Sequence, residues 1–132
     1  MKPETHLAVD PSLCGRVVEL GGGTAEVALD TTAQMVVDDH GLVHGGFVFG
    51  LADYAAMLAV NDPCVVLAGA EVRFLEPVVV GSRIIGRART TSVKGRKHEV
   101  SVEARVGNQL VFDGTFICIV LERHVLDAAG SE

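Results

Sequence analysis

The sequence predicts an α+β fold in which one antiparallel sheet of five to six strands wraps around one long buried helix. Residues 45–61 are apolar on every side when they are read as a helix, which is typical of a buried helix. Two runs with strand character precede this segment and four follow it. No linker, repeat or low-complexity tract divides the chain, so we expect a single domain over residues 1–132 with its core at about 12–123.

The first two strands are expected to form a hairpin. Residues 15–20 and 24–30 flank three consecutive glycines, which suit a tight turn between antiparallel strands. Ala25, Val27 and Leu29 alternate along the second run, as in a half-buried strand. Residues 31–44 then connect the hairpin to the helix, and residues 35–37 within them fit either a helical turn or an extended piece.

The buried helix is predicted to run from about Gly45 to Asn61. It ends there because Pro63 disfavours helical backbone in the residue before it. The remaining strands are separated by turn sequences rich in Gly, Pro and Asn, and are expected at residues 64–75, 82–93, 97–106 and 110–123. We expect residues 1–10 and 125–132 to be frayed ends.

Composition excludes several classes of function. The formal net charge of −6 argues against nucleic acid as the main partner. The N-terminus lacks the apolar core of a secretion signal, and no uncharged run near the middle is long enough to cross a bilayer, so we expect a cytoplasmic protein without a membrane partner. The three cysteines are far apart and contain no Cys-x-x-Cys pair. We therefore expect no disulfide framework, no metal and no cofactor.

Asp53 is the one charged residue in the apolar helix. An ionised carboxylate in such surroundings destabilises a fold by several kcal/mol unless something compensates it. A sequence that retains this group is expected to use it chemically, which makes Asp53 the first candidate for a catalytic residue.

The apolar helix also predicts a partner, because a single sheet covers only one side of a helix. A second copy of the chain is the simplest cover for the other side. Gly46 and Gly50 are four residues apart and would let another helix approach closely. The alternative, in which the same glycines permit tight packing of the helix on its own sheet, stays open at this point.

The start of the helix is suited to bind an oxyanion. Two glycines, Gly45 and Gly46, leave the backbone accessible, and the first N–H groups of a helix lack internal partners and carry positive partial charge. They can stabilise the oxyanion of an attacked thioester, while Asp53 activates water or attacks directly. Gly45 and Asp53 are about 12 Å apart along one helix at ~1.5 Å per residue. Both reach one carbonyl only if two helices pack antiparallel in a homodimer.

The string His44-Gly45-Gly46 followed by Leu51-Ala52-Asp53, together with the order of elements, resembles the hotdog-fold acyl-CoA thioesterases of the phenylacetate-degradation type. The likeness covers residues 12–123. It implies a hotdog fold, dimers that form one continuous sheet, and dimers that often pair into tetramers. It also implies that Asp53 is a general base or nucleophile, and that the Gly45 backbone N–H of the partner subunit, with Gly46 beside it, polarises the thioester carbonyl of an acyl-CoA.

The resemblance departs from the family pattern at Asp38. The family commonly has Asn or Gln six residues before the histidine, where it helps to place water or the carbonyl. A second acid at that position would raise one apparent pKa if it lay near Asp53.

Several other residues are candidates for substrate binding. His44 either bonds the substrate carbonyl or orients the helix start, and Asn61 either caps the helix or lines the acyl tunnel. Phe47 is a candidate tunnel residue. Six of the eleven Lys and Arg residues lie between positions 83 and 97, and they form either a solvated strand face or a rim for the CoA phosphates. The candidates for the rim are Arg83, Arg96 and Lys97.

Two rival functions remain. The spacing of Asp39 and His44 is similar to that of the acid–base pair of hotdog enoyl-CoA hydratases, but this pattern lacks the Asn-Pro of that family and leaves Asp53 without a role. The second rival is a non-catalytic acyl-CoA sensor that controls a DNA-binding partner. In such sensors the helix acid is generally absent and a DNA-binding region is attached, which we do not expect in the residues before the hairpin.

Overall fold

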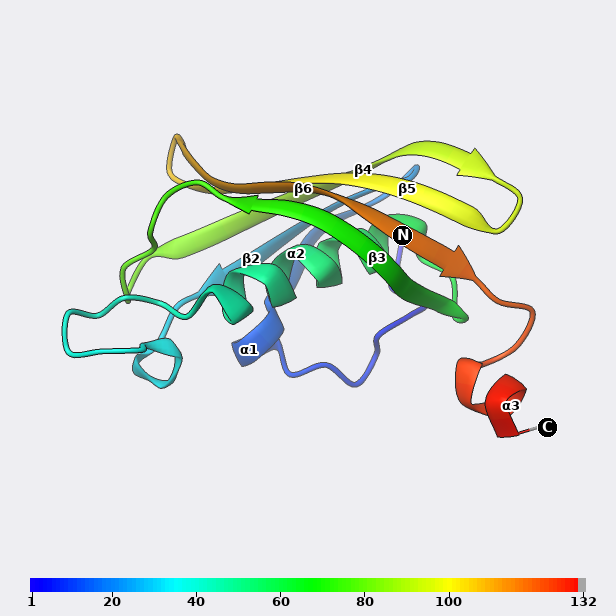
Figure 1. The fold of residues 1–132 in the computed structure, drawn as a ribbon, viewed down its shortest axis with the longest axis horizontal. Coiled ribbons are helices and arrows are strands. Elements are labelled where there is room, and N and C mark those ends of the chain that lie inside the picture. The colour runs from blue at the N-terminus through cyan, green and yellow to red at the C-terminus, as the bar shows by residue number, and fades with distance from the viewer. Residues whose placement is uncertain (131–132) are drawn as a thin grey trace.

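The computed structural model describes residues 1–130. Within this range the strands form one six-stranded antiparallel sheet that arches over a central helix (Figure 1). The strands follow one another in the order β1-β2-β4-β5-β6-β3, so β1 and β3 are the edges. Their bounds are β1 Arg16–Gly21, β2 Thr24–Asp30, β3 Val65–Phe74, β4 Arg83–Lys94, β5 Lys97–Val106 and β6 Gln109–Val120.

The central helix, α2, spans Gly45–Val60 and lies against the concave side of the sheet. Short helical segments accompany it: α1 (Pro11–Cys14), the 3₁₀ turn η1 (Ala33–Met35) and α3 (Val125–Gly130). The predicted order of two strands, one helix and four strands is confirmed. The connecting segment forms a helical turn at η1, but of residues 35–37 only Met35 belongs to it. Val36 is extended and pairs with Val43, so the extended alternative holds for the rest of that piece. α1 and α3 were not predicted, and residues 131 and 132 of the expected frayed end lie outside the described residues.

The core forms where the sheet meets α2. Leu51, Ala55 and Leu58 are fully buried on the helix. They meet alternate residues of the central strands, among them the fully buried Phe112 and Phe116 on β6. Gly86 on β4 leaves room for Leu51, because a Cβ there would lie 3.4 Å from Leu51 Cγ. This close packing holds α2 against β4 at Leu51.

The first fifteen residues, here called the N-terminal strap, cover part of the helix face that points away from the sheet (Figure 1). At the C-terminal end of α2, Asn61 Oδ1 accepts from the Glu4 N–H at 2.7 Å and Asn61 Nδ2 donates to the Lys2 carbonyl at 3.1 Å. Further along, His6 lies beside Tyr54, with ring centroids 6.4 Å apart. The expectation that residues 1–10 are frayed is therefore wrong, because their polar groups bind the helix C-cap.

The strap leaves the surface of α2 around Gly46 and Gly50 uncovered. A Cβ added at Gly50 would have no neighbour within 4 Å, and one at Gly46 would meet the ring of His44. These glycines therefore do not serve packing of the helix on its own sheet, which excludes that alternative. If a second chain covers α2, as predicted, the surface left for it includes Gly46 and Gly50.

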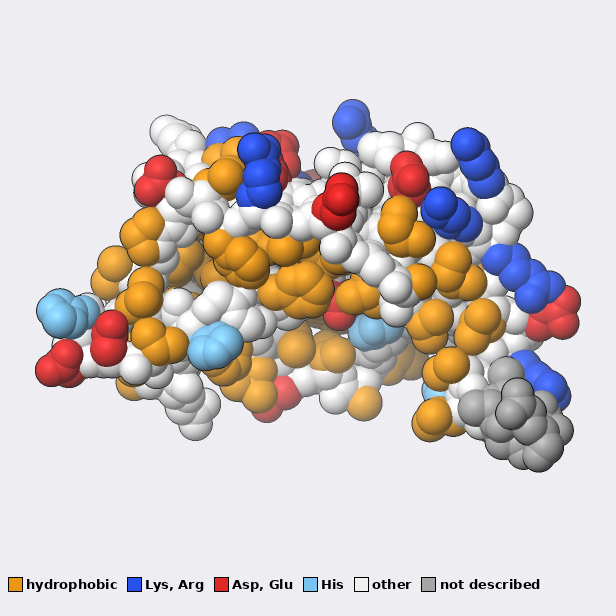
Figure 2. Space-filling model, in the orientation of Figure 1, with side chains coloured by type: hydrophobic (Ala, Val, Ile, Leu, Met, Phe, Trp, Pro, Cys, Tyr) orange, Lys and Arg blue, Asp and Glu red, His pale blue; other side chains and the backbone are white. Residues whose placement is uncertain are grey.

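An apolar band follows the same region of the surface. Figure 2 shows hydrophobic side chains gathered along the middle of the face that carries β3 and α2, with Lys and Arg side chains mostly toward its upper and right margins. The β3 edge contributes to it, and Phe74 at the end of that strand is 55% exposed. None of the helices in residues 1–130 is long and apolar enough to cross a membrane.

The two hydrogen bonds between Asn61 and the strap, here called the Asn61 latch, yield a first prediction. Asn61 adopts a left-handed conformation (φ 53°), which glycine also accepts, so Asn61→Gly removes the amide without backbone strain. We expect it to lower the free energy of unfolding by about 1 kcal/mol. The exchange of the Glu4 amide hydrogen should accelerate at least tenfold. Unchanged exchange at Glu4 would show that the latch does not hold the strap.

Candidate active site

The helix start is organised by His44. Its backbone is extended (φ −61°, ψ 131°), and its Nδ1 accepts a hydrogen bond from the Gly46 N–H at 2.7 Å. The neutral ring therefore carries its proton on Nε2. Of the two roles expected for His44, the structure shows the one at the helix start: the side chain caps the N-terminus of α2. The ring is exposed, and a contact of Nε2 with substrate stays a prediction.

The Gly45 N–H differs from that of Gly46, because no acceptor within the described residues receives a hydrogen bond from it. As the first residue of α2, Gly45 has no intrahelical partner for this group. A Cβ at this position would lie 3.2 Å from Phe74 Cε1. The absence of a side chain therefore keeps the space next to a free, positively polarised N–H open.

Asp53 lies in the middle of α2 and is partly buried. Its Oδ1 is fully buried and has no hydrogen-bond partner among the described residues. Burial raises the pKa of this carboxyl to about 6. No cation among the described residues forms an ion pair with it. At neutral pH the group is therefore ionised but only weakly stabilised, which is the state expected of a general base or a nucleophile.

Two thiols share the surroundings of Asp53. Burial, and then the charges of Asp10 and Asp53, raise the pKa of Cys14 at the end of α1. Burial, and then the charge of Asp53, raise the pKa of Cys118 on β6 to about 12. The charge of Asp53 therefore acts on thiols from two other elements. This relation was not predictable from the sequence, because the three elements are far apart along the chain.

Gly45 and Asp53 are both placed on α2, eight residues apart. At ~1.5 Å per residue the two lie about 12 Å apart on one rigid helix. One chain therefore does not bring them to a single carbonyl carbon. A joint site built by two chains stays a prediction from this distance.

The acids before the helix lie outside this site. Asp38 is exposed, and its Oδ1 accepts from the His40 and Leu42 N–H groups at 3.0 and 3.3 Å, which holds the loop in a turn. Asp39 lies 3.5 Å from His40 and is almost fully exposed. No hydrogen bond joins Asp39 to His44 in the described chain. The arrangement expected of a hydratase is therefore not formed within one chain.

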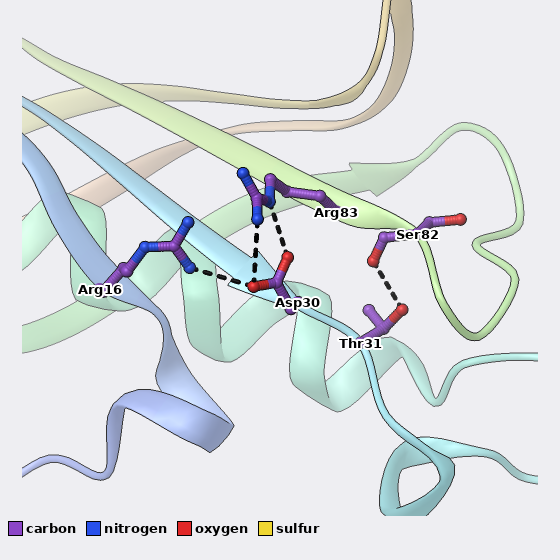
Figure 3. Close-up of polar contacts among 5 residues, drawn as sticks. All are labelled: Arg16, Asp30, Thr31, Ser82 and Arg83. Atoms are coloured by element: carbon purple, nitrogen blue, oxygen red, sulfur yellow. Dashed lines mark hydrogen bonds and ion pairs between the residues drawn. The ribbon is translucent and has the colours of Figure 1, made fainter.

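The basic residues of 83–97 do not form one cluster. Arg83 begins β4 and bonds Asp30, which also pairs with Arg16 (Figure 3). Arg96 lies in the turn after β4 and pairs with Glu122, and Lys97 begins β5 beside it. With ~3.3 Å per residue, the two ends of β4 are about 36 Å apart. A single phosphate rim that includes Arg83 and Arg96 of one chain is therefore excluded.

The remaining candidates are placed as follows. Phe47 is partly buried and its ring lies edge-on to His44, with centroids 6.2 Å apart. Asn61 is the C-cap of α2, and its side-chain amide bonds Lys2 and Glu4 of the strap. A contact between Asn61 and the acyl group stays a prediction. Among residues 1–130, no group of three or more His, Cys, Asp and Glu side chains is arranged to hold a metal.

Comparison with known proteins places this site in context. The model of the Thioesterase superfamily matches residues 40–112, which include both Gly45 and Asp53. An uncharacterized protein from Pyrococcus horikoshii has a structure with a TM-score of 0.95 and 49% identity, over 96% of this chain and 98% of that one. A mutant phenylacetic acid degradation protein PaaI from Thermus thermophilus has a TM-score of 0.77 and 32% identity, over 85% of this chain and all of that one. The fold is the hotdog fold.

Curated relatives carry other names. Methylthioribose-1-phosphate isomerase of Aquifex aeolicus is 52% identical over 121 residues, which are 92% of this chain but 26% of that protein. Transcription factor FapR of Caldanaerobacter subterraneus is 27% identical over 85% of this chain and 56% of its own length. The chain thus spans about a quarter to about half of the curated relatives that it matches.

The raised pKa of Asp53 yields a second prediction. The carboxyl has a folded pKa of about 6 and an unfolded pKa near ~3.9, so burial of the ionised form destabilises the fold as pH rises through this window. Asp53→Asn removes that charge. We compare the unfolding free energy of the variant with that of the parent at each pH. The variant's advantage should be about 1–3 kcal/mol larger at pH 8 than at pH 4. Denaturant titrations at both pH values measure it, and an equal difference at the two would contradict the assignment.

Proposed function

The chain belongs to the thioesterase superfamily, and we propose that it hydrolyses an acyl-CoA thioester to a free carboxylic acid and CoA. The observation that carries the proposal is the pair of unsatisfied polar groups on α2. The Gly45 N–H has no acceptor and the Asp53 Oδ1 has no donor within the described chain. An oxyanion and a water molecule would satisfy them.

In the proposed reaction the thioester carbonyl oxygen accepts a hydrogen bond from the Gly45 N–H. Asp53 takes a proton from water as the water oxygen bonds to the carbonyl carbon, and the N–H stabilises the oxyanion that forms. The C–S bond then breaks, the thiolate of CoA leaves, and the proton held by Asp53 passes to it. If Asp53 attacks directly, an anhydride forms and water cleaves it in a second step.

The proposed site is shared by two chains. The α2 surface around Gly46 and Gly50 is uncovered, and the apolar band over β3 and α2 borders it. An antiparallel helix from a second copy would cover this surface and bring Asp53 of one chain toward Gly45 of the other. We therefore propose a homodimer as the active form, with pairing of dimers into a tetramer as a further step.

The charged part of CoA requires cations at the edge of the site. Arg83 and Arg96 are already paired with Asp30 and Glu122, so they would have to exchange carboxylates for phosphates. Lys97, next to Arg96, is the simpler candidate for a phosphate contact. Because the two ends of β4 are far apart, one CoA would contact the cations at only one end of β4 in any one chain.

The FapR relatives are named as transcription factors, which favours a second candidate for this chain, the non-catalytic acyl-CoA sensor. Asp53 distinguishes the two proposals, since a binding module has no use for a buried base. Release of free thiol from acyl-CoA supports the enzyme. Tight binding of the same acyl-CoA with no thiol release supports the binding module.

The role of Asp53 yields a third prediction. Asp53→Asn removes the base and should lower kcat for acyl-CoA hydrolysis by about 10²–10⁴-fold. The parent's kcat/KM should fall as pH drops through about 6, because protonated Asp53 accepts no proton. Thiol release measured from pH 5 to pH 8 tests both, and a variant with near-parental turnover would exclude Asp53 as the reacting group.

The role of Gly45 yields a fourth prediction. Gly45→Pro deletes the N–H, and proline is favoured at the first position of a helix when the preceding residue is extended, as His44 is. We expect kcat to fall about 10²–10³-fold while the melting temperature changes little. Gly45→Ala is the matched control, because it keeps the N–H and adds a methyl group that the exposed Phe74 ring can accommodate. Equal losses in the two variants would exclude the N–H as the oxyanion donor.

A further inference from the structure

A cavity of about 290 Å³ opens beside the helix start. Gly45 forms part of its wall, so the cavity is next to the N–H that we assign to the thioester carbonyl. The cavity lies where α2, the end of β3 and the segment after β3 meet, and its lining residues are almost all apolar. They include Val43, Val48, Phe74, Leu75, Val78 and Val111.

Phe74 forms the exposed side of this cavity. Its ring lies against Gly45, with Cε1 3.2 Å from the position of a Gly45 Cβ, yet the residue is 55% exposed. On its inner side it contacts Phe112 edge-on, with ring centroids 5.2 Å apart. Phe112 is fully buried and fixed in the core. One face of Phe74 is therefore anchored, while the other is free of the core.

The walls and the rim have different chemistry. Val43, Val48 and Val111 are buried and provide a fixed floor. Among the described residues that line the cavity, Glu76 alone carries a charge, and it is exposed. Such a cavity suits an uncharged apolar group and repels a second carboxylate.

Resting on the proposed thioesterase function, we propose that this cavity takes the acyl group and that Phe74 limits its length. A group of about ten non-hydrogen atoms fills it, if each takes roughly the ~30 Å³ of a water molecule. The substrate class is then medium-length, uncharged acyl-CoA, either a chain of about eight to ten carbons or an arylacyl group of similar volume.

The experiment measures kcat/KM for straight acyl-CoAs of 4, 8, 12 and 16 carbons. For the parent we expect the highest value at 8 carbons and at least a tenfold lower value at 16. Phe74→Ala should raise the ratio of the 12-carbon to the 8-carbon value at least fivefold, and Phe74→Leu should give an intermediate ratio. Val93→Ala, an exposed apolar residue at the far end of β4, is the matched control and should keep the parental ratio.

Adipoyl-CoA tests the charge of the rim. It has a chain length that the cavity accepts but ends in a carboxylate, so its kcat/KM should lie at least tenfold below that of the 8-carbon substrate. Glu76→Gln should reduce this difference severalfold. A parent that cleaves adipoyl-CoA as well as the 8-carbon substrate would overturn the proposed selectivity.

Binding separates failure of this proposal from failure of the proposed function. Calorimetry of Asp53→Asn with the same acyl-CoAs reports the length dependence without turnover. Suppose that neither the parent nor Phe74→Ala cleaves any thioester, but that Phe74→Ala still shifts binding toward 12 carbons. The cavity assignment then stands, and the proposed hydrolysis fails. If Phe74→Ala changes neither the kcat/KM ratio nor the binding ratio by more than twofold while the variant stays folded, the assignment of Phe74 is overturned.

Discussion

Every residue of α2 except Asp53 is uncharged, and this one carboxylate constrains the rest of the molecule. The sheet must bury the helix, but burial of an ionised oxygen without a partner destabilises the fold. Burial raises the pKa of Asp53 to about 6, and no cation among the described residues offsets this effect. Such a group is retained at a thermodynamic disadvantage, which is the usual condition of an active-site acid or base.

The length of α2 adds a second constraint. A rigid helix keeps the carboxylate and the free N–H of Gly45 about 12 Å apart, at ~1.5 Å per residue, so the two groups act together only across two chains. The N-terminal strap binds the C-terminal end of α2 and leaves the surface around Gly46 and Gly50 open. Together these features favour a helix contact near the proposed oxyanion donor.

The sequence was sufficient to predict the sheet, the helix and the two polar groups, because each depends on local pattern: apolar periodicity, glycine turns and one acid in an apolar run. Features that depend on packing between distant segments were not predictable. The strap depends on the amide of Asn61 meeting residues 2 and 4, and Cys14 and Cys118 come to Asp53 from opposite ends of the chain. The basic residues of 83–97 looked clustered in sequence, but an extended strand separates their side chains.

The most direct test of a shared site is a mixed dimer of Asp53→Asn and Gly45→Pro, purified through a different tag on each chain. If each site takes its acid from one chain and its N–H from the other, the mixed dimer contains one intact site and one with both lesions. It should then recover about half of the parental thioesterase activity, although each homodimer is nearly inactive. A mixed dimer as inactive as the two homodimers would contradict the account, because every site would then carry one lesion within its own chain.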